Sequence, residues 1–177
     1  MDTKKLAEYI TFAAGPVDPD HPNEKYRAIL LEFRSPDTLI IVGTDGRRAA
    51  VARVTGPHLM GDANVTVRAA TLAAQISSTL CGEVTPVDGV LMDSAGNVVP
   101  LEIIAGVEPL NWRRAMPGAL PGPDLVRVDP ALLAEAAAAF DGRPITIEPG
   151  NSGVSTPCLD MQAEGGALRY VLAGVRV

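Results

Sequence analysis

Aromatic side chains, cysteine and excess positive charge are all scarce in this sequence. Phe, Tyr and Trp make up only 4% of the 177 residues, so Val, Leu, Ile and Ala must fill any core. The 15 Lys and Arg residues are outnumbered by 21 Asp and Glu residues, which gives a net charge of −6. This balance argues against a protein that coats nucleic acid with its whole surface. It still allows one that gathers its few cations on one face.

Metal-binding and catalytic patterns are also lacking. The two cysteines, Cys81 and Cys158, have no metal-ligand spacing, and both histidines, His21 and His58, stand beside prolines. No secretory signal, phosphate-binding glycine loop or Gly-x-Ser-x-Gly elbow is present, and no apolar run reaches the roughly 20 residues that span a bilayer. We therefore expect reduced thiols, a cytoplasmic location, no membrane partner, no metal or cofactor, no catalytic residues and no enzymatic activity.

Turn-forming residues are abundant by contrast, with 17 Gly and 15 Pro, so short elements are expected. Apolar residues at helical spacing predict three helices, at Thr3–Ala14, Arg68–Leu80 and Pro130–Phe140. Gly15 ends the first of these patterns and Gly142 ends the third.

The three predicted helices belong to three similar modules, offset by 66 and 61 residues. Leu-Ala occupies the same place in each helix, at residues 6–7, 72–73 and 133–134, and Val-x-Val precedes the second and third helices at 65–67 and 126–128. β-like runs follow each helix: 26–33, 38–42 and 49–54; 83–87, 89–93 and 98–104; 145–148, 155–161 and 168–177. The order of elements predicts an α+β fold of repeated strand–helix–three-strand modules, with helices on one face of antiparallel sheets.

A stretch rich in proline and glycine, Pro117–Asp124, predicts a break between the second and third modules. We expect a two-module domain at residues 1–117, a linker at 118–124 and a third half-module at 125–177.

Three motifs carry a family resemblance. The segment TLIIVGTDGRRAAVARV, residues 38–54, places Asp-Gly between two apolar runs, as in a tight hairpin. LNWRRAMP follows at 110–117, and RYVLAGVRV ends the chain at 169–177. In this order, the three resemble the corresponding motifs of bacterial DNA polymerase III beta subunits, the sliding clamps. KLAEYITFAAG and KYRAILLEF similarly resemble the opening helix and strand of the clamp's middle domain. The chain looks like that middle domain joined to the second half of the third.

The resemblance implies a pocket for short extended peptides that carry apolar anchors and a glutamine, with apolar walls and a few fixed polar groups. The residues it assigns to that pocket are Thr44, Gly46, Arg47, Arg48, Ala49, Pro117, Val171, Leu172 and Ala173. Arg47 replaces the usual histidine, Ala49 stands where leucine is common, and Ala173-Gly174 replaces Met-Pro, so we expect an opened or shallower pocket. The alternative for the hairpin is a solvated turn, and the roles of Arg113 and Arg114 stay open.

The resemblance also places helix cations against the phosphate backbone of double-stranded DNA, without sequence specificity. The matching residues are Lys4, Lys5 and Arg68; ordinary solvated cations at helix ends are the alternative. The third helix weakens this interpretation, because Glu135 is its only charged residue.

Two functions follow as hypotheses. The first is a sliding-clamp-like processivity factor for DNA replication, which tethers a polymerase or other clamp-binding partner to DNA and binds the partner's peptide between domains. The second is a clamp-derived peptide-binding or regulatory module that does not encircle DNA. A weaker third hypothesis is an unrelated small-molecule-binding or hydrolytic α+β domain.

Self-association is expected from module arithmetic. Clamp rings contain twelve such modules, so four chains of three modules would be needed for a ring. The third helix lacks its usual neighbouring half-domain, which favours a homo-oligomer, either a dimer or a tetramer.

Overall fold

The computed structural model describes residues 1–114, 116, 126, 128–151 and 157–173. Three α-helices precede groups of strands along these residues: α1 (Thr3–Ala14), α2 (Leu72–Thr79) and α3 (Pro130–Ala139). The strands are β1 (Ile29–Arg34), β2 (Thr38–Thr44), β3 (Arg48–Thr55), β4 (Ala63–Val67), β5 (Val84–Val87), β6 (Val90–Asp93), β7 (Val98–Pro100), β8 (Thr146–Asn151), β9 (Pro157–Ala163) and β10 (Leu168–Ala173). Short 3₁₀ turns are η1 (Glu24–Tyr26), η2 (Trp112–Arg114) and η3 (Glu164–Gly166).

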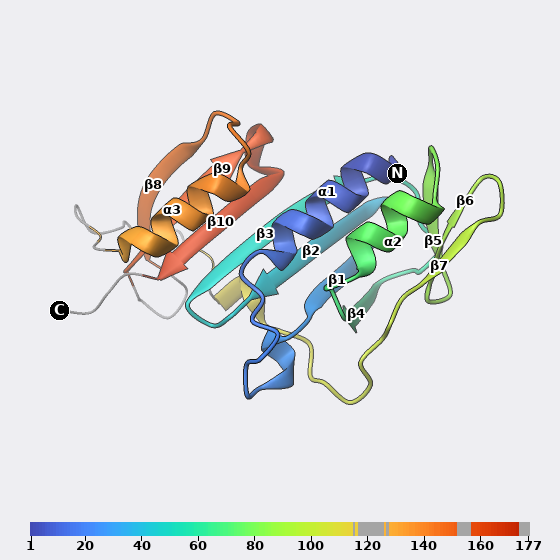
Figure 1. Ribbon diagram of the computed structural model, residues 1–177, viewed down its shortest axis with the longest axis horizontal. Helices are drawn as coiled ribbons and strands as arrows, with labels where there is room; N and C mark the ends of the chain where they lie inside the picture. The colour runs from blue at the N-terminus through green and yellow to red at the C-terminus, as the bar shows by residue number, and fades with distance from the viewer. Residues whose placement is uncertain (115, 117–125, 127, 152–156, 174–177) are drawn as a thin grey trace.

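Seven strands form one antiparallel sheet in the order β4-β1-β2-β3-β10-β9-β8 (Figure 1). The strands β5, β6 and β7 form a second, smaller antiparallel sheet. The junction between β3 and β10 joins the first module to the third within the large sheet. The predicted α+β class with antiparallel sheets is confirmed.

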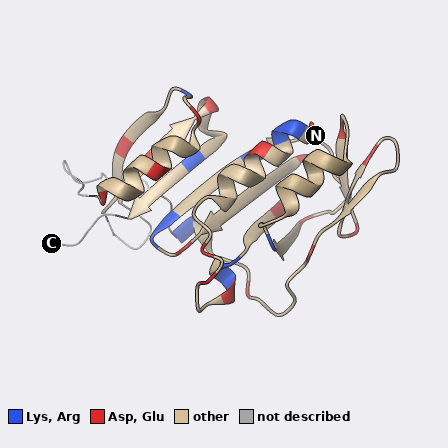
Figure 2. Ribbon diagram, viewed as in Figure 1, with Lys and Arg blue, Asp and Glu red and all other residues tan. Residues whose placement is uncertain are grey.

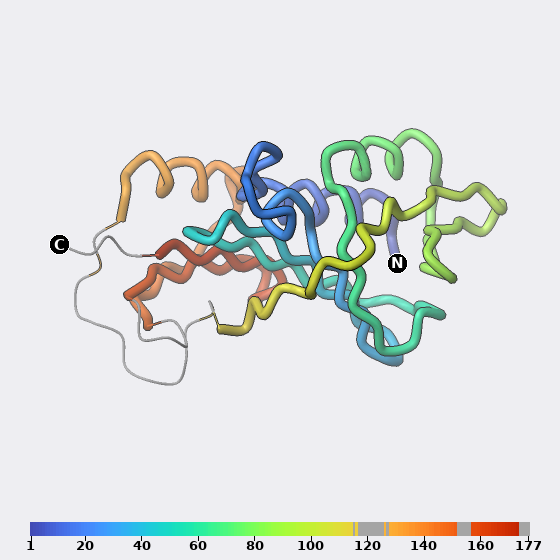
Figure 3. Tube along the Cα trace, turned by 90° about the horizontal axis from the view of Figure 1, so that it is seen from below, coloured from blue at the N-terminus to red at the C-terminus, as the bar shows by residue number. Residues whose placement is uncertain are grey.

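The helices lie on one face of the large sheet, and the segment that contains η2 runs across the opposite face (Figure 3). Because successive side chains of a strand point to opposite faces of the sheet, the strands contribute to two apolar clusters, one on each face. The larger cluster lies under the helices and includes Tyr9, Phe33 and Tyr170; the smaller one lies on the opposite face and includes Val42, Val51 and Met116.

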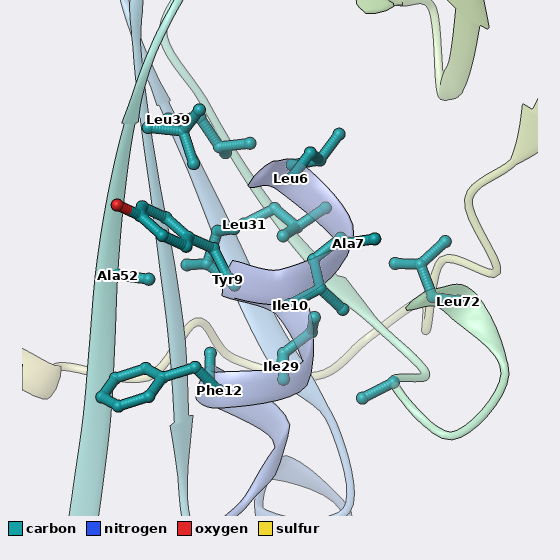
Figure 4. Close-up of a cluster of buried hydrophobic side chains, with 14 of the residues drawn as sticks. Leu6, Ala7, Tyr9, Ile10, Phe12, Ile29, Leu31, Leu39, Ala52 and Leu72 are labelled. Carbon is teal, nitrogen blue, oxygen red and sulfur yellow. The ribbon is translucent and has the colours of Figure 1, made fainter. Parts of the chain in front are cut away.

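The core under α1 is closely packed, as Figure 4 shows for Ile10 and Leu31. Gly43 of β2 allows the end of α1 to approach the sheet, because an added Cβ would lie 1.9 Å from the carbonyl oxygen of Ala13. Towards α3, the Phe12 ring packs edge-on against Phe140, with centroids 5.2 Å apart.

The first two modules complete each other's sheets. The strand that precedes α2, β4, pairs with β1 of the first module. Reciprocally, Met1, which precedes α1, exchanges hydrogen bonds with Val84 of β5: the Met1 amino group donates to the Val84 carbonyl (2.8 Å), and Val84 N–H donates to the Met1 carbonyl (2.7 Å). Each of the first two modules therefore places the segment before its helix beside a strand of the other module.

Several predicted boundaries differ from the structure. The helix α1 matches its prediction, α2 spans Leu72–Thr79 instead of Arg68–Leu80, and α3 ends at Ala139, one residue early. Arg68 instead follows β4, and its N–H donates to the carbonyl of Glu102 (3.3 Å). Val126 and Val128, in the run expected to precede α3 as a strand, lie outside any strand, since no described strand pairs with them as β1 pairs with β4.

The predicted linker, residues 118–124, lies outside the described residues. Among the described residues, no helix combines the length and apolarity required to cross a membrane.

Candidate functional site

The hairpin between β2 and β3 is fixed by its own side chains. The Thr44 hydroxyl donates to the carbonyl of Arg48 (2.6 Å) and accepts the N–H of Gly46 (3.0 Å). The carboxylate of Asp45 accepts the N–H groups of Arg47 (2.9 Å) and Arg48 (3.0 Å). Gly46 has φ = +87°, a conformation that glycine adopts without strain. The turn is thus a defined structure rather than a loose tip.

A pocket of about 230 Å³ opens beside this hairpin. The hairpin contributes Thr44, Gly46 and Ala49 to its lining, and the facing wall comes from η1 and from the segment around η2. Those further lining residues are Tyr26, Leu110, Asn111, Trp112 and Arg114. Apolar walls with a few polar groups suit one apolar side chain and its adjoining backbone.

Trp112 is held rigidly in that wall. Its indole Nε1–H donates to Glu32 (2.8 Å), a carboxylate on β1 that is only 1% exposed. Arg113 also donates to Glu32 (2.9 Å), and its guanidinium stacks 4.4 Å from the centroid of the Trp112 ring. The indole face is therefore positioned before any ligand arrives.

Glu32 is stabilised as a charged group by these donors. Burial alone raises the pKa of this carboxyl, but hydrogen bonds from Arg113, Trp112 and Arg34 outweigh burial and lower the pKa from 4.5 to about 2. The structure thereby separates the two arginines of the WRR motif: Arg113 anchors the segment to the sheet, whereas exposed Arg114 lines the pocket.

Pairing of β3 with β10 brings the C-terminal strand next to the hairpin. Ala49 is opposite Val171 and Arg48 is opposite Leu172 in the register. Ala49 and Val171 belong to the apolar cluster on the pocket's face of the sheet, whereas Leu172 belongs to the cluster under the helices. Val171 therefore lies on the pocket's face of the sheet but outside the pocket lining, and Leu172 faces the helices.

Arg48 also turns away from the pocket, towards the helices. Its guanidinium forms ion pairs with Asp45 (3.0 Å) and with Glu135 of α3. Burial lowers the pKa of Arg48, but the bond to Glu135 and the charges around it outweigh burial and raise the pKa overall. Arg48 thus ties the hairpin to the third module.

The remaining residues that the sequence assigns to the pocket are not among its described lining residues. Arg47 is exposed at the tip of the hairpin, and its carbonyl accepts the N–H of Ala173 (2.9 Å), which is exposed at the end of β10. Pro117 lies outside the described residues. The structure therefore gathers Thr44, Gly46 and Ala49 around the pocket, and Val171 is paired with Ala49 on the neighbouring strand.

Sequence reasoning missed most of the opposite wall. Tyr26, Leu110, Asn111 and Trp112 were not assigned, although three of them lie in or beside the LNWRRAMP motif. The alternation of side chains along β3 also predicts which of its residues can face the pocket. Because neighbouring strand residues face opposite ways, Arg48 and Ala49 could not both line one pocket.

The cations expected to face DNA lie apart from the pocket. Lys4 and Lys5 are exposed at the start of α1, and Arg68 is 56% exposed after β4. Lys5 lies 4.0 Å from Glu164, and Arg68 lies 3.8 Å from Glu24. Two of the three cations therefore already have an acidic neighbour.

The helix face as a whole has no excess of positive charge. The helices α1, α2 and α3 together contain two lysines, Lys4 and Lys5, and two glutamates, Glu8 and Glu135 (Figure 2). The nearby Arg143 is engaged by Glu8 and Glu164. An electropositive wall is thus not built from the described helices.

The two cysteine thiols lie in different environments, and neither lines the hairpin pocket. Burial and the neighbouring Asp160 raise the pKa of the Cys158 thiol to about 11, so it is protonated at neutral pH. Cys81 is exposed. The described residues hold no cluster of three His, Cys, Asp or Glu side chains suited to a metal ion.

Comparisons with known proteins show which solved structures share this fold. No protein-family model matches the sequence, and no curated protein matches it either. Among solved structures, the chain is similar to the DNA polymerase III beta chain from Streptococcus pneumoniae TIGR4, with a TM-score of 0.76 and 12% identity over 100% of this chain and 64% of that one. DNA polymerase III subunit beta from Pseudomonas aeruginosa gives a TM-score of 0.74 and 12% identity, over 100% and 65% of the two chains. A sliding clamp from Pseudomonas aeruginosa bound to griselimycin gives 0.63 and 15%, over 100% and 64%.

These matches define the class: the protein is a clamp-like α+β protein. More particularly, its fold is that of the bacterial DNA polymerase III beta subunits, the family whose motifs TDGRR, WRRAMP and RYVLAGVRV resemble. The chain spans about 65% of the length of these solved chains, slightly less than two thirds.

Proposed function

We propose that this protein is a non-catalytic, clamp-like scaffold that binds short peptides of DNA-replication partners in the pocket beside the β2–β3 hairpin. The observation that carries the proposal is the pocket itself, where Thr44, Gly46 and Ala49 face the anchored Trp112. A preformed apolar surface next to fixed backbone groups is the arrangement that extended peptides use.

Specificity in this pocket would come from few contacts. Its volume of about 230 Å³ accepts one large apolar anchor, and Arg114 offers the charged donor at the rim. Because the small Ala49 replaces a larger side chain expected from the resemblance, the wall next to β10 is shallow. We therefore expect weak binding, with a dissociation constant on the order of 100 μM.

Calorimetric titration with a short synthetic peptide that carries one glutamine and two large apolar residues tests this proposal. Heat that saturates with the peptide, and no heat with the same peptide whose apolar residues are alanine, is the expected result. Arg114→Ala should weaken binding about threefold or more, because it removes a charge-assisted donor at the rim.

Arg53→Ala is the matched control. Arg53 is an exposed arginine on the same strand as Ala49 but outside the pocket lining, so its loss should leave peptide affinity unchanged. Absence of binding at about 1 mM wild-type protein and peptide, or equal losses in both variants, would contradict a peptide site at the hairpin.

A second candidate function is tethering to DNA, as a processivity factor. The observation that favours it is the layering: all three described helices share one face of the large sheet, and Lys4 and Lys5 are exposed there (Figure 3). The equal number of lysines and glutamates in these helices opposes it. Peptide binding is therefore the function that the geometry supports best.

A further inference from the structure

The three modules differ in how their helices are covered. In α1, Ala7 is 6% exposed and Ile10 is 1% exposed. The offset of 66 residues places Ala73 and Ile76 at these positions in α2, where Ile76 is fully buried. Figure 4 shows why: Leu72 of α2 faces Ala7 and Ile10 of α1. This side of each helix is where one module packs on the other.

The same side of α3 is uncovered. A further offset of 61 residues places Ala134 and Ala137 at these positions, and both are exposed. Leu133, which corresponds to the fully buried Leu6, is only partly buried. The contact surface that the first two modules share is therefore present in the third module without a partner among the described residues.

The opposite side of α3 is accounted for within the chain. Glu135, Ala138 and Ala139 line the groove that separates α3 from α1. Around a helix, Leu133, Ala134 and Ala137 lie away from that groove, towards the outer edge of the sheet. Ile147 of the edge strand β8 extends the apolar surface there and is 47% exposed.

The composition of α3 agrees with a buried environment. The helix reads PALLAEAAAA, so every residue except Glu135 is apolar. A helix that is apolar on all sides is normally covered on all sides. Glu135 itself is paired with Arg48, away from the uncovered side, so no like charges would meet across a self-contact.

We propose that two copies of this chain associate about a two-fold axis through the uncovered side of α3, with Leu133, Ala134, Ala137 and Ile147 at the contact. A second copy is the occupant that fits, because α1 and α2 already show two copies of this module packing helix on helix, each with its leading segment beside a strand of the other. An uncharged surface is also compatible with itself, as an isologous interface requires.

The contact runs through the helices rather than through continuation of the sheet. The edge strand β8 contains Glu148 and Pro149, both exposed. Charge and proline in an edge strand oppose pairing with another strand.

Light scattering on the purified chain at about 50 μM tests the proposal, since association depends on concentration. The expected mass is twice the 18.5 kDa of one chain. Ala137→Glu should give the single-chain mass, because a charge would be buried at the contact. Ala138→Glu is the matched control, since residue 138 corresponds to Thr11 and Ser77, which are exposed in their own helices. It should leave the double mass unchanged.

Cross-linking locates the contact independently. In a Cys81→Ser background, Ala137→Cys should form a disulfide between copies under mild oxidation, whereas Ala138→Cys should not. Circular dichroism identifies any variant that fails to fold. A wild-type chain that stays at single mass at about 50 μM, or equal behaviour of the paired variants at 137 and 138, would overturn the proposal.

Discussion

Glu32 is a buried carboxylate that fastens the pocket wall to the sheet. Its pKa is lowered from 4.5 to about 2 because the hydrogen bonds from Arg113, Trp112 and Arg34 outweigh the effect of burial. A group with a depressed folded-state pKa stabilises the fold above its unfolded pKa and loses that contribution as the pH falls towards the folded value. A shift of this size corresponds to about 3 kcal/mol.

The pH dependence of unfolding should therefore change when Glu32 is replaced. Wild type should lose up to about 3 kcal/mol between pH 5 and pH 2, and Glu32→Gln should lose correspondingly less over the same interval while being less stable at pH 7. Urea unfolding at a series of pH values measures both. Glu102→Gln, at an exposed carboxylate, is the control and should follow wild type. Parallel pH profiles for wild type and Glu32→Gln would show that this carboxylate does not carry the dependence.

At the scale of the element, α3 depends on its N-terminal cap. The carboxylate of Asp129 accepts the N–H of Ala131 (2.8 Å), and Pro130 occupies the first turn, where its missing N–H costs nothing. Asp129→Ala should destabilise the chain by about 1 kcal/mol, whereas Asp129→Asn keeps the acceptor and should be nearly neutral. Denaturant unfolding separates the two. Equal losses for Ala and Asn would mean that charge, not the cap hydrogen bond, stabilises this end.

The elements also show what local sequence could and could not predict. The boundaries of α1 follow from apolar spacing and from Gly15, both of which are local signals. The junction of β3 with β10 joins residues more than a hundred positions apart, and pairing over that distance leaves no local pattern. The family resemblance predicted that these two strands lie close together. The position of Trp112 in the pocket wall could not be predicted, because it depends on a hydrogen bond to Glu32, which is 80 residues away in the sequence.

At the scale of the whole molecule, the distribution of positive charge determines how strongly DNA can bind. A protein that grips DNA by charge releases counterions, so its affinity falls with salt in proportion to the number of phosphates it contacts. Only Lys4, Lys5 and Arg68 were assigned to such contacts, and Lys5 and Arg68 have acidic neighbours. We therefore expect weak binding of double-stranded DNA, with a salt slope of about −3 or smaller in magnitude.

Retention on closed DNA distinguishes charge from topology. A ring would remain on circular DNA in high salt and slide off when the circle is cut, even with a neutral inner face. The resemblance predicts that a closed ring would need twelve modules, so a pair of three-module chains would supply only half of them. We expect the chain to leave circular and linear DNA equally fast on gel filtration at about 0.2 M salt, where charge contacts are weakened. Lys4→Ala/Lys5→Ala should then weaken the residual low-salt binding and reduce its salt slope, while peptide affinity is unchanged, because the α1 lysines lie apart from the hairpin pocket. Complexes that survive on circular DNA and dissociate on linearisation would instead establish an encircling clamp, with four chains as the expected assembly.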